Sequence, residues 1–374
     1  MKIAYLLHAP FGGLGRAASC EFPRRMAKRA DVTVFAPVVR RAPEETAGAT
    51  PFKLVSRKRS ALLWFRAWWQ ELSRCSPDIV HVYYSPRTFP LYAALRRAAP
   101  NARWCIDIRA PLLAQGKKLW FAQQMGLRLH HHFDLCFGTS LENARRAFPN
   151  VFSAEQGPSS AQGFPYRDLP FGVDCALASA AARGKKLLPS EGSGPRKAVY
   201  VGTLAKARRL DVLLRGVDRF CQTPQGRGFY LDLWGEGDAE EELRSYASQR
   251  GLPVRFCGRA PHDVLLQRLG HYDVGIGFVP GGAYEDSPSL KVLEYCASGL
   301  LCLASKTRAH ERFMAQGFEG LVFENTEQGV CDALVRAFQN DIGAPFVQNI
   351  KHAQQYDWDV LIEERLLPSY KDLL

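Results

Sequence analysis

The feature of this sequence that most constrains its fold is a regular alternation of short apolar runs with longer amphipathic stretches. The alternation occurs in the first half of the 374 residues and returns in the second half. Such alternation is typical of parallel sheets covered by helices on both faces. Two rounds of it predict an α/β protein with two Rossmann-like, doubly wound domains. The predicted strands are Ile3–His8, Val32–Ala36, Phe52–Val55, Ile79–Tyr83, Trp104–Ile108, Leu135–Gly138, Ala198–Val201, Tyr230–Trp234, Val254–Cys257, Val274–Phe278, Leu301–Ala304 and Gly320–Phe323.

A region rich in Gly, Pro and Ser, from about 157 to 197, separates the two rounds and is interpreted as linker and surface loop. The predicted domains are therefore 1–172 and 173–355. The tail from about 356 to 374 has an amphipathic helical pattern, and we consider that it packs back on the first domain.

The basic residues are concentrated in the first half. Residues 1–172 hold 25 Lys and Arg against 11 Asp and Glu, a net charge of +14, whereas residues 173–374 hold 24 against 26. This asymmetry suggests an anionic acceptor or an anionic membrane surface as a partner of the first half. Nucleic acid is not expected, because there is no basic-aromatic RNA-binding signature.

Cysteine spacing and hydropathy indicate the compartment. The ten cysteines are scattered singly with no C-x-x-C pair, which predicts free thiols in a reducing cytosol and argues against a zinc site. No run approaches the roughly 20 apolar residues needed to span a bilayer. We expect a cytoplasmic protein that can associate peripherally with the inner face of the cytoplasmic membrane.

The most informative stretch for chemistry is YEDSPSLKVLEYCASGLLCLAS, residues 284–305. Ser287 and Pro288 predict the N-cap and first turn of a helix that runs to about Ser298 and stops at Gly299. The backbone N–H groups at such a helix start favour a diphosphate. The groups expected there are those of Ser287, Ser289 and Leu290.

Lys291 and Glu294 are three residues apart on this helix and share a face. Glu294 stands in an otherwise apolar run, and a buried carboxylate needs hydrogen-bond donors. A ribose diol would supply two. The alternative is a surface ion pair between Lys291 and Glu294.

Asp286 and Glu294 frame a D-x7-E pattern that resembles the donor-site motif of retaining family 4-type glycosyltransferases with the GT-B fold, which usually show E-x7-E. The resemblance implies that Glu294 binds the ribose hydroxyls of a nucleotide. It also implies that an acid near position 286 holds the hydroxyls of the donor sugar and takes part in catalysis. Asp286 and Glu285 are both candidates for that second role.

The stretch VYVGTLAKARRLDVLL, residues 199–214, resembles another motif of the family. It places Arg208 at the position of a lysine that clamps the diphosphate. Thr203 stands where the family has an arginine, and Arg209 stands where it has a glycine. One of two expected cations is therefore missing, and Lys206, Arg209 or Lys291 is left to compensate.

Further segments and several glycines complete the resemblance. The segments 233–247, 254–261, 170–174 and 78–84 also follow the family order, and the loop at 254–261 is implied to abut the nucleobase. The expected donor contacts are Gly13, Gly202, Thr203, Gly235 and Gly258.

The family resemblance implies two domains that face a cleft and a retaining hexosyl or N-acetylhexosaminyl transfer from a nucleoside-diphosphate sugar, with UDP favoured over GDP. It implies no metal and no cofactor. With the basic first half, it suggests a lipid-linked or anionic glycan acceptor, as in bacterial cell-envelope or lipopolysaccharide assembly. The alternative is a nucleotide-sugar epimerase or hydrolase on the same fold, for which His8 is the visible candidate base.

Three residues of the first half are candidate acceptor-side contacts. His8 ends the first predicted strand, and Asp107 and Arg109 lie at the end of the strand at 104–108, where ligands of doubly wound sheets bind. A structural ion pair at the strand end explains Asp107 and Arg109 equally well.

Two stretches could meet a membrane. Ala61, Phe65, Trp68 and Leu72 form an apolar stripe after a basic run, although a core helix gives the same pattern. The segment 117–121 adds a second patch, with Lys117, Lys118, Trp120 and Phe121.

Overall fold

The computed structural model describes residues 1–11, 17–37, 53–57, 61–149, 151–152, 164–182, 196–339 and 345–374. Within them the chain forms two compact units. One contains Met1–Phe171 together with Trp358–Leu374, and the other contains Gly172–Asp357. Each unit has its own parallel sheet and its own hydrophobic core.

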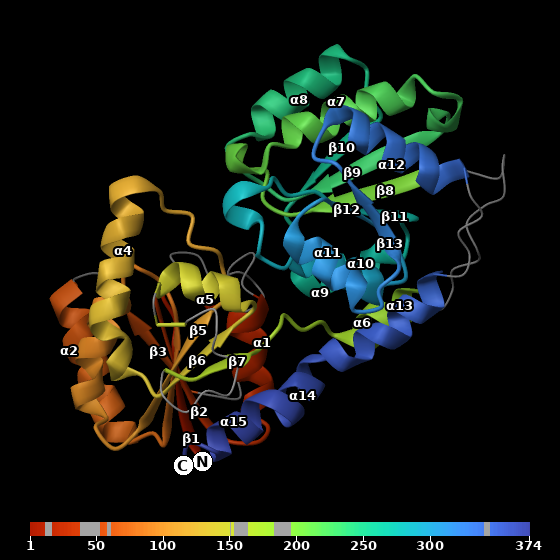
Figure 1. The fold of residues 1–374 in the computed structure, drawn as a ribbon. Helices are drawn as coiled ribbons and strands as arrows, with labels where there is room; N and C mark the ends of the chain where they lie inside the picture. Colours follow the sequence, from red (N-terminus) through yellow and green to blue (C-terminus); the bar gives the residue numbers. More distant parts are fainter. Residues whose placement is uncertain are drawn as a thin grey trace. The chain divides into compact units, whose positions relative to one another are not determined.

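The first unit is built on a seven-stranded sheet in the order β3-β2-β1-β4-β5-β6-β7, in which every pairing is parallel. Helices cover the sheet (Figure 1), and buried apolar side chains line both of its faces. Its elements are β1 (Lys2–Leu6), α1 (Ala17–Met26), β2 (Asp31–Pro37), β3 (Lys53–Arg57), α2 (Ala61–Cys75), β4 (Ile79–Tyr83), α3 (Phe89–Leu95), β5 (Arg103–Ile108), α4 (Gly116–Leu129), β6 (Leu135–Gly138), α5 (Leu141–Ala147), β7 (Tyr166–Asp168), α14 (Trp358–Leu361) and α15 (Leu367–Lys371).

The C-terminal segment is part of the first unit because its apolar face is buried there. Trp358 is 1% exposed and meets the ring of Phe22 edge-on, with the centroids 5.0 Å apart. Asp359 pairs with Arg25 and Arg29 on the α1 side. These contacts join two parts of the chain that are more than 300 residues apart.

The second unit contains a six-stranded parallel sheet in the order β10-β9-β8-β11-β12-β13. Its core gathers aliphatic and aromatic side chains from the strands and from the helices α7 and α12. Its elements are α6 (Cys175–Ala182), β8 (Arg196–Val201), α7 (Leu210–Cys221), β9 (Phe229–Trp234), α8 (Glu240–Gln249), β10 (Val254–Gly258), α9 (His262–Leu269), β11 (Val274–Gly277), α10 (Leu290–Ala297), β12 (Leu301–Ser305), α11 (Arg308–Ala315), β13 (Gly320–Phe323), α12 (Glu327–Gln339) and α13 (Pro345–Ala353).

All twelve predicted strands are present, and the α/β prediction is confirmed. The linker prediction for about 157–197 is wrong in part, because this region contains β7 and α6. β7 has three residues and pairs only with β6 at the sheet edge, too short for a periodic pattern. The start of α6 did carry a signal, since Asp174 Oδ1 accepts a hydrogen bond from the Leu177 amide.

Strand order reverses between β1 and β4 in the first sheet and between β8 and β11 in the second. At such a point the loops that leave two neighbouring strands diverge, and ligands bind beyond the carboxyl ends of the strands. In the second unit these loops are the segments that follow Val201 and Gly277.

Two residues of the stripe on α2, Trp68 and Leu72, belong to the core. Trp68 is 1% exposed and lies between the rings of Phe35 and Tyr92, at centroid distances of 5.5 and 6.4 Å. The core-helix interpretation therefore holds for these two residues. Among the described residues, no helix is both long enough and apolar enough to cross a membrane.

Candidate active site

The helix that follows β11 begins two residues later than predicted. Ser289, with φ −103° and ψ 114°, is the N-cap of α10, whereas the Ser287 amide donates to the carbonyl of Tyr284 at 3.1 Å and closes the preceding turn. The helix ends where expected, and Gly299 adopts a left-handed φ of +69°. Within the described part of the chain, the backbone amides of Ser289, Leu290 and Lys291 have no hydrogen-bond acceptor. They form an open donor set at the positive end of the helix.

Two cations lie close to this helix start, each over an aromatic ring. The Nζ of Lys291 is 4.0 Å from the ring centroid of Tyr200, and the guanidinium of Arg208 is 4.4 Å from that of Tyr284. Neither cation forms an ion pair with a carboxylate among the residues described. Burial and the nearby charge of Arg208 hold the pKa of Lys291 well below its ordinary value. Two adjacent cations without a counter-ion favour an anionic ligand.

The other candidate cations of the β8–α7 segment are neutralised by neighbours. Lys206 Nζ is 2.5 Å from Glu242 Oε1, and Arg209 Nε is 3.2 Å from Asp211 Oδ1. Of the three residues that could compensate for Thr203, Lys291 is thus the one without a carboxylate partner among the described residues. Thr203 itself is exposed.

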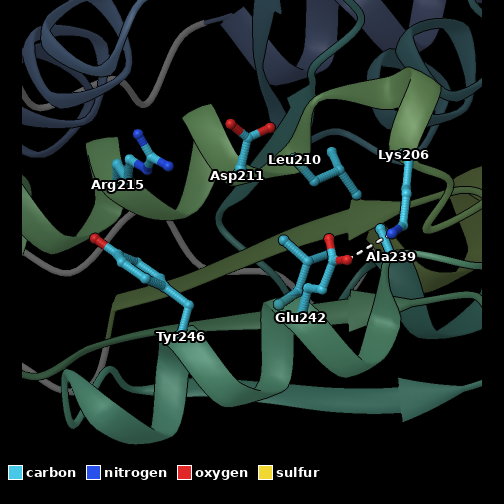
Figure 2. A pocket seen from close by; sticks show the side chains of 8 residues that line it. Lys206, Leu210, Asp211, Arg215, Ala239, Glu242 and Tyr246 are labelled. Atoms are coloured by element: carbon cyan, nitrogen blue, oxygen red, sulfur yellow. Dashed lines mark hydrogen bonds and ion pairs between the residues drawn. The ribbon is translucent and has the colours of Figure 1, made fainter.

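A hollow of about 370 Å³ lies between α7 and α8 in the second unit (Figure 2). Figure 2 shows the ion pair of Lys206 and Glu242 at one end, with Asp211, Arg215 and Tyr246 around the rest. Arg208 and Lys291 do not line this hollow. Acidic and basic side chains are mixed in its lining, which gives it no net preference for an anion.

Glu294 lies on α10 and is 5% exposed. Its Oε1 is 2.5 Å from Nε2 of His262, and the alternative considered from the sequence, a surface pair with Lys291, does not form among the described residues. Among the described residues Oε2 accepts no hydrogen bond, which leaves an acceptor for a diol. His262 was not anticipated from the sequence. The signal available was its position directly after the segment 254–261, which the family motif associates with the nucleobase.

Three glycines bring the ends of β8, β9 and β10 into close contact. The Gly202 amide donates to Trp234, and the Gly235 amide donates to Gly258 at 2.8 Å. A Cβ atom at Gly235 would lie 1.9 Å from the carbonyl oxygen of Gly202, and one at Gly202 would lie 2.9 Å from Nζ of Lys291. Any side chain at these positions would force the backbones apart and displace the lysine.

The two candidate sugar-binding acids have different surroundings. Both carboxylate oxygens of Asp286 accept from Arg308, at 2.9 and 2.6 Å, and one also accepts from Arg312 at 3.1 Å. The hydrogen bond from Arg308 is the main reason that the pKa of Asp286 is lowered. Oε1 of Glu285 accepts from the backbone amide of Arg308 at 3.0 Å. Asp286 is therefore the more fully neutralised of the two.

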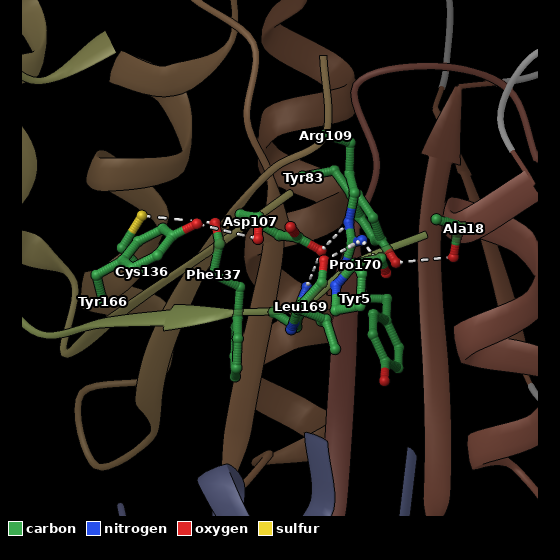
Figure 3. Close-up of polar contacts among 12 residues, drawn as sticks. Tyr5, Ala18, Tyr83, Asp107, Arg109, Cys136, Phe137, Tyr166, Leu169 and Pro170 are labelled. Carbon is green, nitrogen blue, oxygen red and sulfur yellow. Dashed lines mark hydrogen bonds and ion pairs between the residues drawn. The ribbon is translucent and has the colours of Figure 1, made fainter. Parts of the chain in front are cut away.

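Asp107 and Arg109 form a buried ion pair inside the first unit (Figure 3). Asp107 is 0% exposed, and its Oδ2 accepts from Nε of Arg109 at 2.7 Å and from Nε2 of His81 at 3.1 Å. Burial alone would raise the pKa of Asp107, but Arg109 and His81 keep it lowered. Arg109 also donates to the carbonyls of Leu169 and Pro170. This is the structural ion pair considered from the sequence, and an acceptor-side role for the two residues stays a prediction.

The remaining candidates of the first half are His8 and Gly13. His8 is exposed just beyond β1, and Gly13 lies outside the described residues. Among the residues that the structure describes, no group of three or more His, Cys, Asp and Glu side chains is placed to hold a metal ion. All ten cysteines are free thiols.

Two doubly wound parallel-sheet domains in one chain define the GT-B class of fold, here with an open set of donors and cations at the switch point of the second sheet. In agreement with this class, residues 195–340 match the family model of glycosyl transferases group 1. The matched residues span most of the second unit. No curated protein sequence matches the chain.

Similar solved structures share this fold over the whole chain. HepE from Anabaena in complex with UDP and glucose is 15% identical, with a TM-score of 0.74 and 100% of both chains covered. Sucrose-phosphate synthase from Thermosynechococcus elongatus is 15% identical, with a TM-score of 0.74 and coverage of 100% and 99%. The lipopolysaccharide outer core galactosyltransferase WaaB is 16% identical, with a TM-score of 0.68 and 100% of both chains covered.

Proposed function

We propose that the protein is a retaining glycosyltransferase that takes a hexosyl or N-acetylhexosaminyl group from a nucleoside-diphosphate sugar. The observation that carries this proposal is the pair formed by Arg208 and Lys291. Both cations lack a carboxylate partner within the described residues, and Lys291 belongs to the helix whose first amides are open. A diphosphate supplies the negative charge and the acceptor oxygens that this arrangement lacks.

The nucleoside would be held by the carboxylate that lies deeper on α10. Glu294 has one oxygen on His262 and one without a partner among the described residues. Vicinal ribose hydroxyls can donate to such a carboxylate. Gly258 and the loop after it would lie against the base. We favour UDP over GDP, in line with the UDP complexes of the similarly folded HepE.

In the proposed reaction, the bond between the anomeric carbon and the β-phosphate oxygen breaks as the acceptor hydroxyl forms a bond on the same face of the sugar. The diphosphate leaves with the electron pair and takes the hydroxyl proton, so no protein base is required. Arg208, Lys291 and the α10 amides stabilise the charge that develops on the leaving group. Glu285 holds the sugar hydroxyls in our assignment, because Asp286 is already neutralised by two arginines. No metal and no cofactor are needed for these steps.

The basic first half leads us to propose a lipid-linked or anionic glycan acceptor, in bacterial envelope glycan assembly. The structural similarity to WaaB, a lipopolysaccharide galactosyltransferase, is compatible with that setting.

The direct test is a thermal-shift and calorimetric panel of nucleoside diphosphates and their sugars, measured with and without EDTA. We expect binding of UDP and of at least one UDP-sugar, and turnover of that sugar in the presence of EDTA. Loss of turnover that Mn²⁺ restores would contradict the metal-free mechanism. Absence of binding to any nucleotide would contradict the donor assignment.

A further inference from the structure

The outward face of α4 in the first unit carries two exposed aromatic side chains among basic residues. Trp120 and Phe121 are each 61% exposed, the largest exposed fractions of any aromatic side chain among the described residues. A helix turns about 100° per residue, so Lys117, Trp120, Phe121 and Arg128 lie on one side of it. We call this side the α4 face; Lys117, Lys118 and Arg128 are exposed there or at its edge.

The opposite side of α4 fixes the helix to the first unit. Ala122 and Gly126 are buried, and a Cβ atom at Gly126 would lie 2.8 Å from both the carbonyl of Ala147 and the ring of Phe148. Gln123 also donates to the carbonyl of Arg146 at 3.0 Å. The helix therefore cannot rotate to bury Trp120 and Phe121 without losing these contacts. Exposure of the two rings is a consequence of how α4 packs.

The charged residues of α4 itself have a single sign. No Asp or Glu occurs between Asp107 and Asp134, whereas Lys117, Lys118 and Arg128 all lie on this helix. The wider first half has a net charge of +14. Contiguous exposed apolar groups rimmed by polar residues mark contact surfaces, and at the α4 face the contact must also accommodate positive charge.

We propose that the α4 face docks the protein on an anionic phospholipid surface, with Trp120 and Phe121 inserted at headgroup level and Lys117 and Lys118 on lipid phosphates. Aromatic rings beside lysines are the side chains that interfacial helices use for this purpose. A symmetric contact with a second copy of the chain is disfavoured, because it would bring the same lysines and two basic halves together. The proposal is independent of the sugar-transfer reaction.

The test is co-sedimentation of the full chain with vesicles. One set contains equal parts of phosphatidylglycerol and phosphatidylcholine, and the other contains phosphatidylcholine alone. We expect binding to the anionic vesicles only, weakened by added salt. Trp120→Ala combined with Phe121→Ala should lower the partition coefficient by about tenfold or more, and Lys117→Ala should lower it by about fivefold.

The matched control is Val347→Ala, which truncates a 74% exposed apolar side chain on α13 in the second unit and should leave partitioning unchanged. Circular dichroism and UDP affinity of each variant report whether it is folded. Equal sedimentation of wild type and the aromatic double variant would overturn the proposal. So would a wild-type dimer in solution that the double variant converts to a monomer, because a second copy would then cover the α4 face.

Discussion

Nε2 of His262 lies 2.5 Å from Oε1 of Glu294, across a distance of 32 residues in the sequence. The pair joins α9 to α10 and holds the carboxylate without consuming both of its oxygens. The side-chain exposures are 43% for the histidine and 6% for the glutamate, so the histidine is the solvent-facing member of the pair.

Glu294→Ala should abolish measurable UDP binding while the fold is kept, because the variant removes the proposed acceptor for the ribose hydroxyls. His262→Ala should weaken UDP binding less, by about tenfold, since the carboxylate remains but loses its support. Isothermal titration with UDP and GDP measures both. The control is Glu241→Ala, which changes an exposed glutamate on α8. Wild-type affinity in Glu294→Ala would refute the ribose assignment.

UDP affinity should fall as the pH rises through the lowered pKa of Lys291. Burial and the charge of Arg208 lower the pKa of its amine in the free protein, and a bound diphosphate would raise that pKa again. Binding then takes up a proton wherever the pH lies between the two pKa values, and affinity is highest below both. Calorimetry in buffers of different ionisation enthalpy measures the uptake. It should disappear in Lys291→Met, and an unchanged uptake in that variant would assign the proton elsewhere.

Asp286→Asn and Glu285→Gln should have separable effects. Loss of the ion pairs with Arg308 and Arg312 should destabilise the protein by about 1 kcal/mol, a modest value because both arginines are half exposed. Arginine pairing lowers the pKa of Asp286, so this contribution is present above the unfolded pKa of about 4 and is lost as the pH falls further. The stability difference should therefore vanish in acid.

Glu285→Gln should instead weaken binding of a UDP-sugar relative to UDP, with little change in stability. Comparing the two ligands by titration for both variants decides which acid contacts the sugar. A larger loss of sugar affinity in Asp286→Asn would transfer that role to Asp286.

Arg209→Gly should stabilise the protein. Arg209 adopts φ 52° and ψ 40°, a left-handed conformation that disfavours a side chain, and this explains why the family motif has glycine there. Relief of the strain should add about 1 kcal/mol and raise the melting temperature by about 2–4 °C. Arg209→Ala is the control, because it removes the exposed pair with Asp211 but keeps the Cβ atom. Equal melting temperatures for the two variants would contradict this explanation.

Local periodicity determined most of the fold in advance. Buried parallel strands are continuous apolar runs, and the turns between them carry glycine and proline. Twelve strands and two doubly wound domains could therefore be predicted from the sequence. A three-residue edge strand such as β7 has no period to detect. The start of α10 was misplaced by two residues because Ser287 and Ser289 are both good caps, and only the turn closed by Tyr284 and Ser287 selects between them.

The sequence by itself determined which residue types the proposed donor site contains, since Lys291 and Glu294 lie three residues apart on one helix and Asp286 precedes that helix in the same segment. Tertiary structure alone decided which charges remain available. Glu242 and Asp211 neutralise Lys206 and Arg209, Arg308 and Arg312 occupy Asp286, and Asp107 is buried with Arg109 and His81. The reason is physical: a charge is neutralised by whatever the fold brings within a few ångströms, and those partners are as much as 36 residues away in the sequence.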